Sequence, residues 1–552
     1  MIPLWERGGN LILRAMRILR TAAPVLGMAL VASSAAAAQP ADRPVGRCMA
    51  TLHPVDEPLL RTGALAWAPG DSAAVNAPLG SRDAVGCRHR PLADGQSGDR
   101  SMRRLRGAWP ELRLVAAGGV PDSRGDGALW AGRGLSARLR GGLLLDLGPF
   151  HAALVPELWS TANRPYDLLS TSAISGDTSR SPLASPFYQG PHTLDLPSRL
   201  GVAPLRVLTP GQSALWVTVR TVDLGLSSSN SWWGPGQRDG LLLGPGAAGV
   251  PRAFVRTTRP IDTRMGRWQA EWLLGTLTES RWFDATPAND RRSFSAARLE
   301  WSPPGTAGFL VGAARAVQRV TTARLPTGRL GDVLRSTAIT GGDQMAALYA
   351  ALNTPGLHAY AEIASSRPPN GIRTLLAQPG DDRGYQLGVE RRIVRGRTRW
   401  RILADVANTD PGISLRDRPA RDFYAGAAAP HGWTHRGQLL GAGIGPGGTS
   451  QWLSVDRQRA EWMVGGYAER VRWNNEVLTR LYLPTIFRHD VTVRGGIRGA
   501  LRLPMGAHTY RVALDASWGT RLNYLFQNTT WIRDYRTVDI RIPQLQLVIA
   551  PG

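Results

Sequence analysis

Apolar and polar residues alternate along much of this 552-residue chain, and few folds accommodate that alternation over such a length. In the segment 508–526, Leu514 and Trp518 occupy even positions, whereas Arg511 and Asp515 occupy odd ones. Successive side chains of a β-strand point to opposite faces, so this spacing separates the apolar residues from the charged ones. The same alternation recurs in the segments 213–222, 267–280, 358–366, 398–408 and 458–470. The chain is therefore predicted to be all-β.

The length of the alternating region favours one large closed barrel. Between Glu111 and Ile549 lie about 16–18 candidate strands of roughly ten residues, the segment length of membrane barrels, and no linker separates them. A polar outer face also suits a β-sandwich, so a secreted protein of several β-domains is the alternative. We predict a large transmembrane antiparallel β-barrel of about 16–18 strands over residues 107–552, with polar side chains toward the lumen.

An N-terminal leader indicates export. Residues 21–38 form an apolar run after a basic stretch and end in small residues, as a secretory signal peptide does. We expect residues 1–38 to be the signal peptide, with cleavage after Ala38, and Met16 is a possible alternative start to Met1. No later stretch approaches the roughly 18 consecutive apolar residues of a membrane-spanning helix. The expected location is therefore the cell outer membrane.

Residues 39–106 do not alternate and are rich in Pro, Gly, Asp and Arg. We expect a short periplasmic segment or a plug of the barrel. Cys48 and Cys87, the two cysteines of the chain, both lie in it. They can form a disulfide in an oxidising compartment, and two unpaired cysteines are the alternative.

The charge of the chain is strongly positive. The formal net charge is +24, and Lys does not occur, so all 66 basic residues are Arg. The absence of Lys indicates a compositional bias, which weakens a functional interpretation, but the surplus still attracts polyanions. For an exported protein, acidic polysaccharide and lipopolysaccharide phosphate are more plausible partners than nucleic acid, which is not expected.

The stretch SWWGPGQRDG at 231–240 combines two tryptophans, a Gly-Pro-Gly break and a charged pair. We expect a strand that crosses from lumen to rim, with Trp232 on one side and Trp233 on the other. A tryptophan beside Arg238 and Asp239 can stack on a sugar ring while the charges bind its hydroxyl or carboxylate groups. An aromatic anchor with an internal salt bridge is the alternative.

Two further segments carry candidate ligand-binding side chains. In the first, His431 and His435 stand four residues apart, but the Gly and Pro content excludes the helix that a metal site would need. A loop folded into the lumen, with His435 and Arg436 in its polar lining, is the better interpretation. In the second, RWNNE at 472–476, Trp473 and Asn474 resemble a sugar-binding set, and a strand end with an Asx turn is an equal alternative.

Several segments resemble, in order, those of the Wzi-type capsule assembly proteins. They are NSWWGPG at 230–236 followed by GVPR at 249–252, the first-hairpin segment 126–139, the middle strands 341–390, and the later segments 432–456 and 469–476. The similarity runs from about Trp109 to the C-terminus. The resemblance implies an outer-membrane β-barrel of about eighteen strands that acts as a lectin for surface polysaccharide.

These observations together predict an outer-membrane lectin-like barrel that binds an acidic capsular or extracellular polysaccharide and serves capsule assembly or attachment. The expected binding residues are Trp232, Arg238, Asp239, His435, Arg436, Trp473 and Asn474. A porin-like channel for anionic solutes is the first alternative. A barrel hydrolase is the second, but no convincing nucleophile motif or carboxylate pair supports enzyme activity. We expect no cofactor and no metal, and outer-membrane lipid and lipopolysaccharide as the surroundings.

Overall fold

The computed structural model describes residues 104–168, 181, 183–185, 194–306, 308–334, 339–354, 356–366, 383–410, 423–459, 461–476, 489–505, 508–526 and 538–551. The predicted leader, both cysteines and residues 39–103 lie outside these ranges. Strand β1 begins at Arg104, three residues before the expected start of the barrel. The described residues contain no helix long and apolar enough to cross a membrane.

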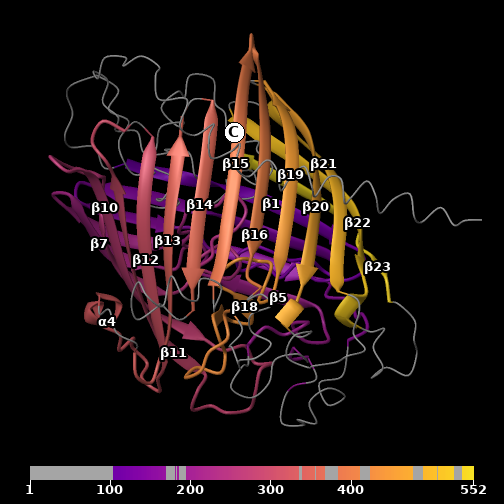
Figure 1. The fold of residues 1–552 in the computed structure, drawn as a ribbon, viewed down its shortest axis with the longest axis horizontal. Coiled ribbons are helices and arrows are strands. Elements are labelled where there is room, and N and C mark those ends of the chain that lie inside the picture. The colour runs from indigo at the N-terminus through magenta and orange to yellow at the C-terminus, as the bar shows by residue number, and fades with distance from the viewer. Residues whose placement is uncertain are drawn as a thin grey trace, which may run out of the picture. The chain divides into compact units, whose positions relative to one another are not determined.

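The described strands form a closed, antiparallel barrel of 18 strands, as the alternation predicts (Figure 1). It closes where β1 pairs with β24, with Leu112 opposite Ile549. Four barrel strands are each interrupted once, and their two segments are β3 and β4, β5 and β6, β8 and β9, and β23 and β24. In chain order the elements are β1 Arg104–Ala117, β2 Gly134–Leu147, β3 Phe150–Leu154, β4 Glu157–Thr161, β5 Leu205–Thr209, β6 Ala214–Val219, β7 Val222–Ser227, β8 Arg252–Thr257, β9 Ile261–Thr263, β10 Gly266–Thr278, β11 Arg291–Ser302, β12 Phe309–Val320, α4 Leu330–Leu334, β13 Asp343–Asn353, β14 Leu357–Ser365, β15 Arg383–Arg395, β16 Thr398–Asn408, β17 Thr434–His435, β18 Gln438–Leu439, β19 Thr449–Gln458, β20 Trp462–Trp473, β21 Asp490–Met505, β22 His508–Leu522, β23 Ile540–Arg541 and β24 Gln544–Pro551.

The two faces of the wall differ in the way that the alternation predicts. In β22, Leu514 and Trp518 are exposed on the outside, whereas Arg511 is buried on the lumen side. In β16, Arg401 and Asp405 are likewise buried. An apolar outer face and a polar inner face are the arrangement that a lipid bilayer requires of a barrel.

The connections at the two ends of the barrel differ in length. Two-residue turns join β2 to β3, β6 to β7 and β15 to β16, whereas the chain between β7 and β8 runs from 228 to 251 and that between β16 and β19 from 409 to 448. The β15–β16 turn is at the upper end in Figure 1, and α4, which belongs to a long connection, is at the lower end. In outer-membrane barrels the long loops face the outside of the cell.

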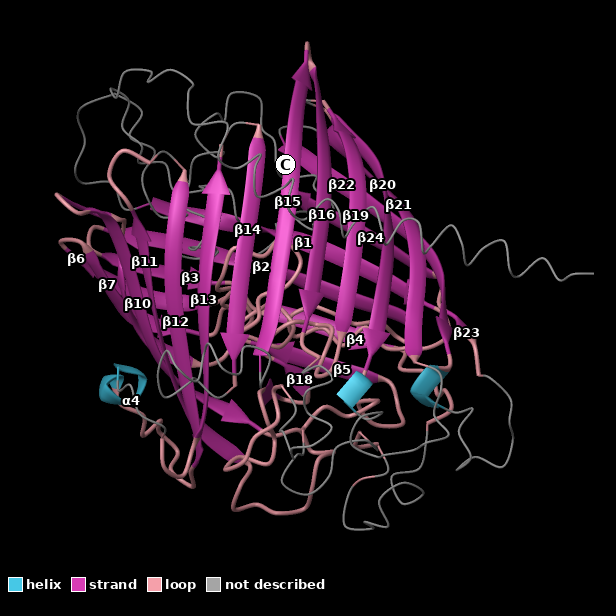
Figure 2. Ribbon diagram, viewed as in Figure 1, coloured by secondary structure: helices cyan, strands magenta, loops and turns pink. Residues whose placement is uncertain are grey.

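Long loops fold back into the lumen and pack there (Figure 2). Leu241, Leu242 and Trp433 join one hydrophobic cluster with inward residues of the wall, among them Phe294 of β11 and Leu273 of β10. The two loops are also tied together, since the Trp433 indole donates to the Leu242 carbonyl at 2.8 Å. Loop residues therefore supply a hydrophobic core inside the barrel.

The tryptophan pair at 232–233 does not lie on a strand, so that part of the sequence prediction is wrong. Residues 228–251 contain no strand, and both indoles are buried, with 6% and 2% of their surface exposed. The backbone turns here because Gly234 has a φ of +91°, and a Cβ atom there would meet Glu362 Oε2 at 2.5 Å. Two adjacent indoles find buried surroundings in a folded loop rather than on opposite faces of a strand.

Candidate functional site

A polar cavity of about 110 Å³ lies in the lumen between the wall and two inward loops. Its wall residues come from β1, β19, β20, β21, β22 and β24, and its loop residues come from the connections β1–β2 and β7–β8. A space of this size accepts several water molecules when polar groups surround it. Arg238 and Asp239 of the opening motif both line it, so the structure places these two expected site residues together.

Glu469 of β20 is the acceptor at the centre of this region. Arg238 donates to Glu469 Oε1 at 2.6 Å, Arg124 donates to Oε2 at 2.8 Å, and Arg494 of β21 also donates to Oε2. Asp122 bridges Arg124 and Arg494 from the other side, at 2.6 and 2.9 Å. Charge-assisted bonds of this kind fix the planar guanidinium groups in place.

The loop carboxylate Asp122 is ionised despite its burial. Burial alone opposes ionisation, but the positive charges of Arg124 and Arg494 outweigh it and hold the pKa of Asp122 below its usual range. Burial alone would lower the pKa of Arg124, but the negative charges of Asp122 and Glu469 raise it well above its usual value. The network therefore stays charged near neutral pH.

Aromatic rings of β19 and β20 form one side of the cavity. Trp452 and Tyr467 stack with ring centroids 4.3 Å apart. The guanidinium of Arg238 lies 3.5 Å from the Trp452 ring centroid, and that of Arg498 lies 5.7 Å from both rings. Asp515 accepts from the Tyr467 hydroxyl at 2.8 Å. Arginine therefore already covers the tryptophan face that a sugar would use, and a stacked sugar would have to displace Arg238.

The β7–β8 loop reaches across the lumen to hold Arg238 and Asp239 in place. The backbone N–H of Gln237 donates to the Tyr360 hydroxyl of β14 at 3.1 Å, while the next residue bonds to β20. Asp239 Oδ1 accepts from the backbone N–H of Gly443 at 2.8 Å. A Cβ atom at Gly236 would lie 2.1 Å from the carbonyl oxygen of Asp239, so this position needs glycine. The Gly-Pro-Gly sequence thus permits the close turn that aims the charged pair.

Trp473 and Asn474 lie at the end of β20, linked to the cavity through Arg124. The Trp473 indole donates to the Thr492 hydroxyl at 2.9 Å, and the guanidinium groups of Arg124 and Arg521 lie 5.3 and 4.9 Å from its ring centroid. Asn474 has a φ of +49°, a left-handed turn conformation that Asn tolerates. The ring faces the lumen and is held by arginines, whereas Asn474 ends the strand.

His435 and Arg436 lie elsewhere, against β10. His435 is fully buried, and its Nδ1 accepts from the backbone N–H of Thr278 at 3.1 Å. Burial, with the nearby charges of Arg436 and Arg292, lowers the pKa of His435 well below its usual value, so the ring is neutral. Arg436 is exposed, with a φ of +53°. The loop folds inward as expected, but the structure does not bring this pair to the cavity.

Sequence reasoning missed most of the residues that surround Arg238. Glu469, Arg494, Trp452 and Asp515 are spread over four strands, and nothing in their spacing links them. One signal could have found them. In β20–β22 charged residues fall at the alternate positions whose side chains point into the lumen, and such residues must meet partners inside the barrel. Strand register then decides which of them meet.

The arrangement suits recognition of a polar solute by hydrogen bonding. Carboxylates and guanidinium groups are nearly balanced around the cavity, so it does not present a single sign of charge to a ligand. Among the described residues, no group of three or more His, Cys, Asp or Glu side chains is placed to hold a metal ion.

Comparison with known proteins identifies likeness in fold only. No protein-family model matches the sequence, and no curated protein matches it either. The structure is similar to that of Wzi from Escherichia coli, described as an outer membrane protein involved in group 1 capsule assembly and a carbohydrate-binding β-barrel. The TM-score is 0.52 at 12% identity, over 80% of this chain and 84% of that one.

Weaker matches include two Occ proteins. OccK2 of Pseudomonas aeruginosa, solved with glucuronate, has a TM-score of 0.39 at 12% identity, over 81% of this chain and 95% of that one. OccAB2 of Acinetobacter baumannii has a TM-score of 0.39 at 10% identity, over 80% and 97%. By its likeness to Wzi, the chain has a Wzi-like outer-membrane barrel fold.

Proposed function

We propose that this protein is an outer-membrane, lectin-like barrel that binds an acidic capsular or extracellular polysaccharide and takes part in capsule assembly or in attaching the capsule to the cell. The observation that carries the proposal is the packing of loops inside the lumen. Leu241, Leu242 and Trp433 are buried among inward wall residues, which leaves the described lumen with an apolar core where a diffusion channel needs water. The likeness of the fold to a carbohydrate-binding barrel agrees with it.

The polar cavity is the proposed contact point for the polymer. Arg238, Asp239 and Trp452 offer a guanidinium group, a carboxylate and an indole within one small space. Because the cavity is small and its ring faces are covered by arginine, it takes a substituent of a sugar rather than a whole ring. Many such contacts along a repeating polymer add up through avidity. Trp473, through Arg124, supports this site from the strand end, while Trp232 stabilises the loop.

The alternative function is a porin-like channel for anionic solutes. Arginines line part of the lumen, but those near the cavity are bonded to carboxylates, as Arg494 is to Asp122 and Arg498 to Asp456. Paired arginines attract a free anion less than unpaired ones would. An enzymatic function has no supporting arrangement among the described residues, and we do not propose one.

Binding of surface polysaccharide to the detergent-folded barrel tests the proposal. The polymer is purified from the cells that make the protein, and its affinity is measured across a salt series. We expect saturable binding that weakens with salt and falls by roughly tenfold in Arg238→Gln, the loss expected for one charge-assisted hydrogen bond.

The matched control is Arg140→Gln. Arg140 is another buried lumen arginine, bonded to Glu111 and Glu157 at 3.0 and 3.2 Å, and it does not line the cavity. We expect its affinity to equal that of the unsubstituted protein. Equal losses in both variants would assign the effect to general destabilisation. Absent binding together with steady conductance in a planar bilayer would favour the channel.

A further inference from the structure

The connection between β12 and β13 folds onto the outer wall of the barrel. The backbone N–H groups of Thr327 and Gly328 donate to the Ser293 hydroxyl at 3.0 and 2.8 Å, and Asp332 of α4 accepts from Arg319 at 2.8 Å. By strand register, Ser293, Ser295 and Val317 all face outward, yet each is almost fully buried. The segment that contains α4 therefore covers part of the surface that faces lipid.

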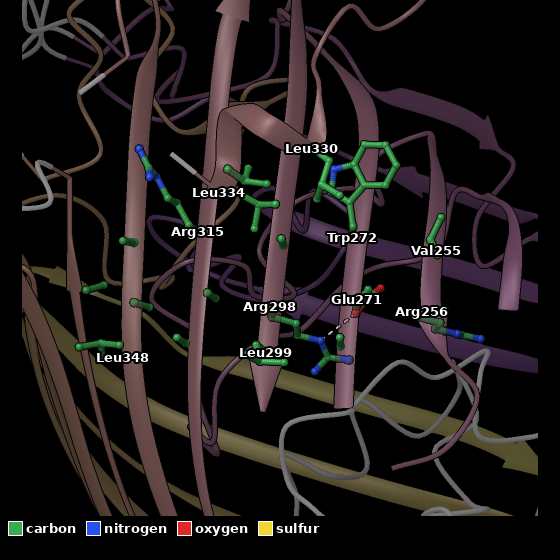
Figure 3. A pocket seen from close by; sticks show the side chains of 18 of the residues that line it. Val255, Arg256, Glu271, Trp272, Arg298, Leu299, Arg315, Leu330, Leu334 and Leu348 are labelled. Carbon is green, nitrogen blue, oxygen red and sulfur yellow. Dashed lines mark hydrogen bonds and ion pairs between the residues drawn. The ribbon is translucent and has the colours of Figure 1, made fainter. Parts of the chain in front are cut away.

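A groove of about 710 Å³ opens on the wall beside this cover. Its sides are mainly apolar: Leu330, Val333 and Leu334 of α4, with Trp272, Leu299 and Leu348 of the strands. Figure 3 shows Leu330, Leu334 and Trp272 at one end and Leu299 and Leu348 farther along. The floor contains alanines of β11, β12 and β13, whose short side chains leave a depression. An extended acyl chain fits such a surface.

Two arginines border the groove on the same outward face. Cross-strand pairs connect Arg315 to Ala346, Ala346 to Ser365, and Ser365 to Arg383, so both arginines lie in one row across the sheet. Strand spacing puts their Cα atoms roughly 14 Å apart. An arginine on the lipid face of a barrel is costly at the bilayer midplane and less so near the interface. Two arginines in one row beside an apolar groove suit an anionic partner.

We propose that this groove binds the lipid moiety of lipopolysaccharide, with one acyl chain lying between α4 and the wall and a phosphate taken by Arg315. Arg383 reaches a second anionic group of the same headgroup. The partner is a lipid because the groove lies on the face that contacts the bilayer and is apolar. It is a phosphorylated one because both arginines border the groove together with α4, which belongs to a connection at the long-loop end, the side on which headgroups lie.

The position of Arg315 strengthens the assignment. Its guanidinium donates to Gln344 Oε1 of β13 at 2.5 Å, and Gln344 is paired across the sheet with Val317 of β12. Guanidinium groups bind phosphate in a forked geometry, which suits a phosphorylated headgroup. The site does not depend on polysaccharide binding in the lumen, so either proposal can fail alone.

Native mass spectrometry of the detergent-folded protein with defined lipids tests the proposal. The probes are diphosphoryl lipid A, its dephosphorylated form and phosphatidylglycerol. We expect stable adducts of diphosphoryl lipid A, and a roughly tenfold loss in Arg315→Gln, as for one charge-assisted bond. Ala346→Phe, which fills the floor of the groove, should weaken the binding of lipid A both with and without its phosphates.

Arg470→Gln is the matched control. Arg470 of β20 also faces outward and donates to a glutamine of the neighbouring strand, Gln451, at 3.1 Å, but it lies on a part of the wall that α4 does not contact. We expect its adducts to be unchanged. Three outcomes would each overturn the proposal. They are equal losses in Arg470→Gln and Arg315→Gln, equal binding of lipid A with and without its phosphates, and binding of phosphatidylglycerol equal to that of diphosphoryl lipid A.

Discussion

The lumen has two halves that are built on the same alternation but filled differently. Along β10–β13 the inward residues include Leu273, Phe294, Ala316 and Ala347, and loop residues such as Trp433 pack against them. Along β19–β22 the inward residues include Trp452, Glu469, Arg494 and Asp515, and the loops bring Arg124 and Arg238 to them. Hydrophobic burial thus dominates at the first set of strands, although Arg298 also pairs there with Glu271 and Glu300, and ion pairs dominate at the second.

The difference assigns a separate task to each half. Apolar burial gains free energy without directional demands, so the apolar half anchors the loops. Buried ion pairs contribute little net stability, because desolvation offsets their attraction, but losing one partner is costly. The polar half therefore positions side chains around a cavity, and it is the half where a ligand can exchange with water.

Trp433→Ala should have the largest effect, because it empties the centre of the apolar half. Trp433 is 2% exposed, packs edge-on against Phe294 with centroids 5.6 Å apart, and bonds to the Leu242 carbonyl. We expect the free energy of unfolding to fall by about 3–5 kcal/mol, measured by urea titration of the folded barrel. Trp518→Ala, at an outward indole that is 59% exposed, is the control. A smaller loss at Trp433 than at Trp518 would contradict the anchoring role.

Glu469→Gln should have the next largest effect, because three arginines depend on this carboxylate. The substitution keeps the shape but removes the charge that Arg124, Arg238 and Arg494 share. We expect a loss of about 3 kcal/mol and weaker polysaccharide binding, measured on the same samples. Adding Arg238→Gln should recover part of the stability, since it removes a charge that the described ion pairs join to Glu469. No recovery in the double variant would mean that the three contacts are not coupled.

The sequence predicted the wall better than its contents, and the two halves show why. Alternation in residues 398–408 and 508–526 is a local signal, and it placed Arg401 and Arg511 on the lumen side. The meeting of Arg238 with Glu469 depends on a loop fold and on strand register across 231 residues, for which no local pattern exists. Trp232 was wrongly assigned to a strand because a folded loop has no sequence periodicity from which its fold can be predicted. Trp473 was recognised, but not the arginines that hold it.

His435 gives the apolar half a dependence on pH just below neutrality. Its pKa is lowered in the fold, so below pH 6.5 the unfolded chain binds a proton that the folded chain does not. Stability is therefore lost as pH falls below that value, by about 1.4 kcal/mol per pH unit for one proton. His435→Asn should reduce the slope between pH 6.5 and 5 by that amount, measured by urea titration at each pH. An unchanged slope would show that His435 is protonated in the folded state.

Tyr467→Phe should have the smallest effect and separates stability from binding within the polar half. The substitution keeps the ring that stacks on Trp452 and removes the hydroxyl that donates to Asp515 at 2.8 Å. We expect a loss of about 1 kcal/mol in urea titration, because the Asp515 carboxylate loses one donor beside the cavity. Affinity for polysaccharide should change more than this small loss of stability suggests, since Tyr467 lines the cavity and its hydroxyl orients an acceptor there. If affinity is unchanged while stability falls, Tyr467 has a structural role only. The polymer then contacts the cavity on the side of Arg238.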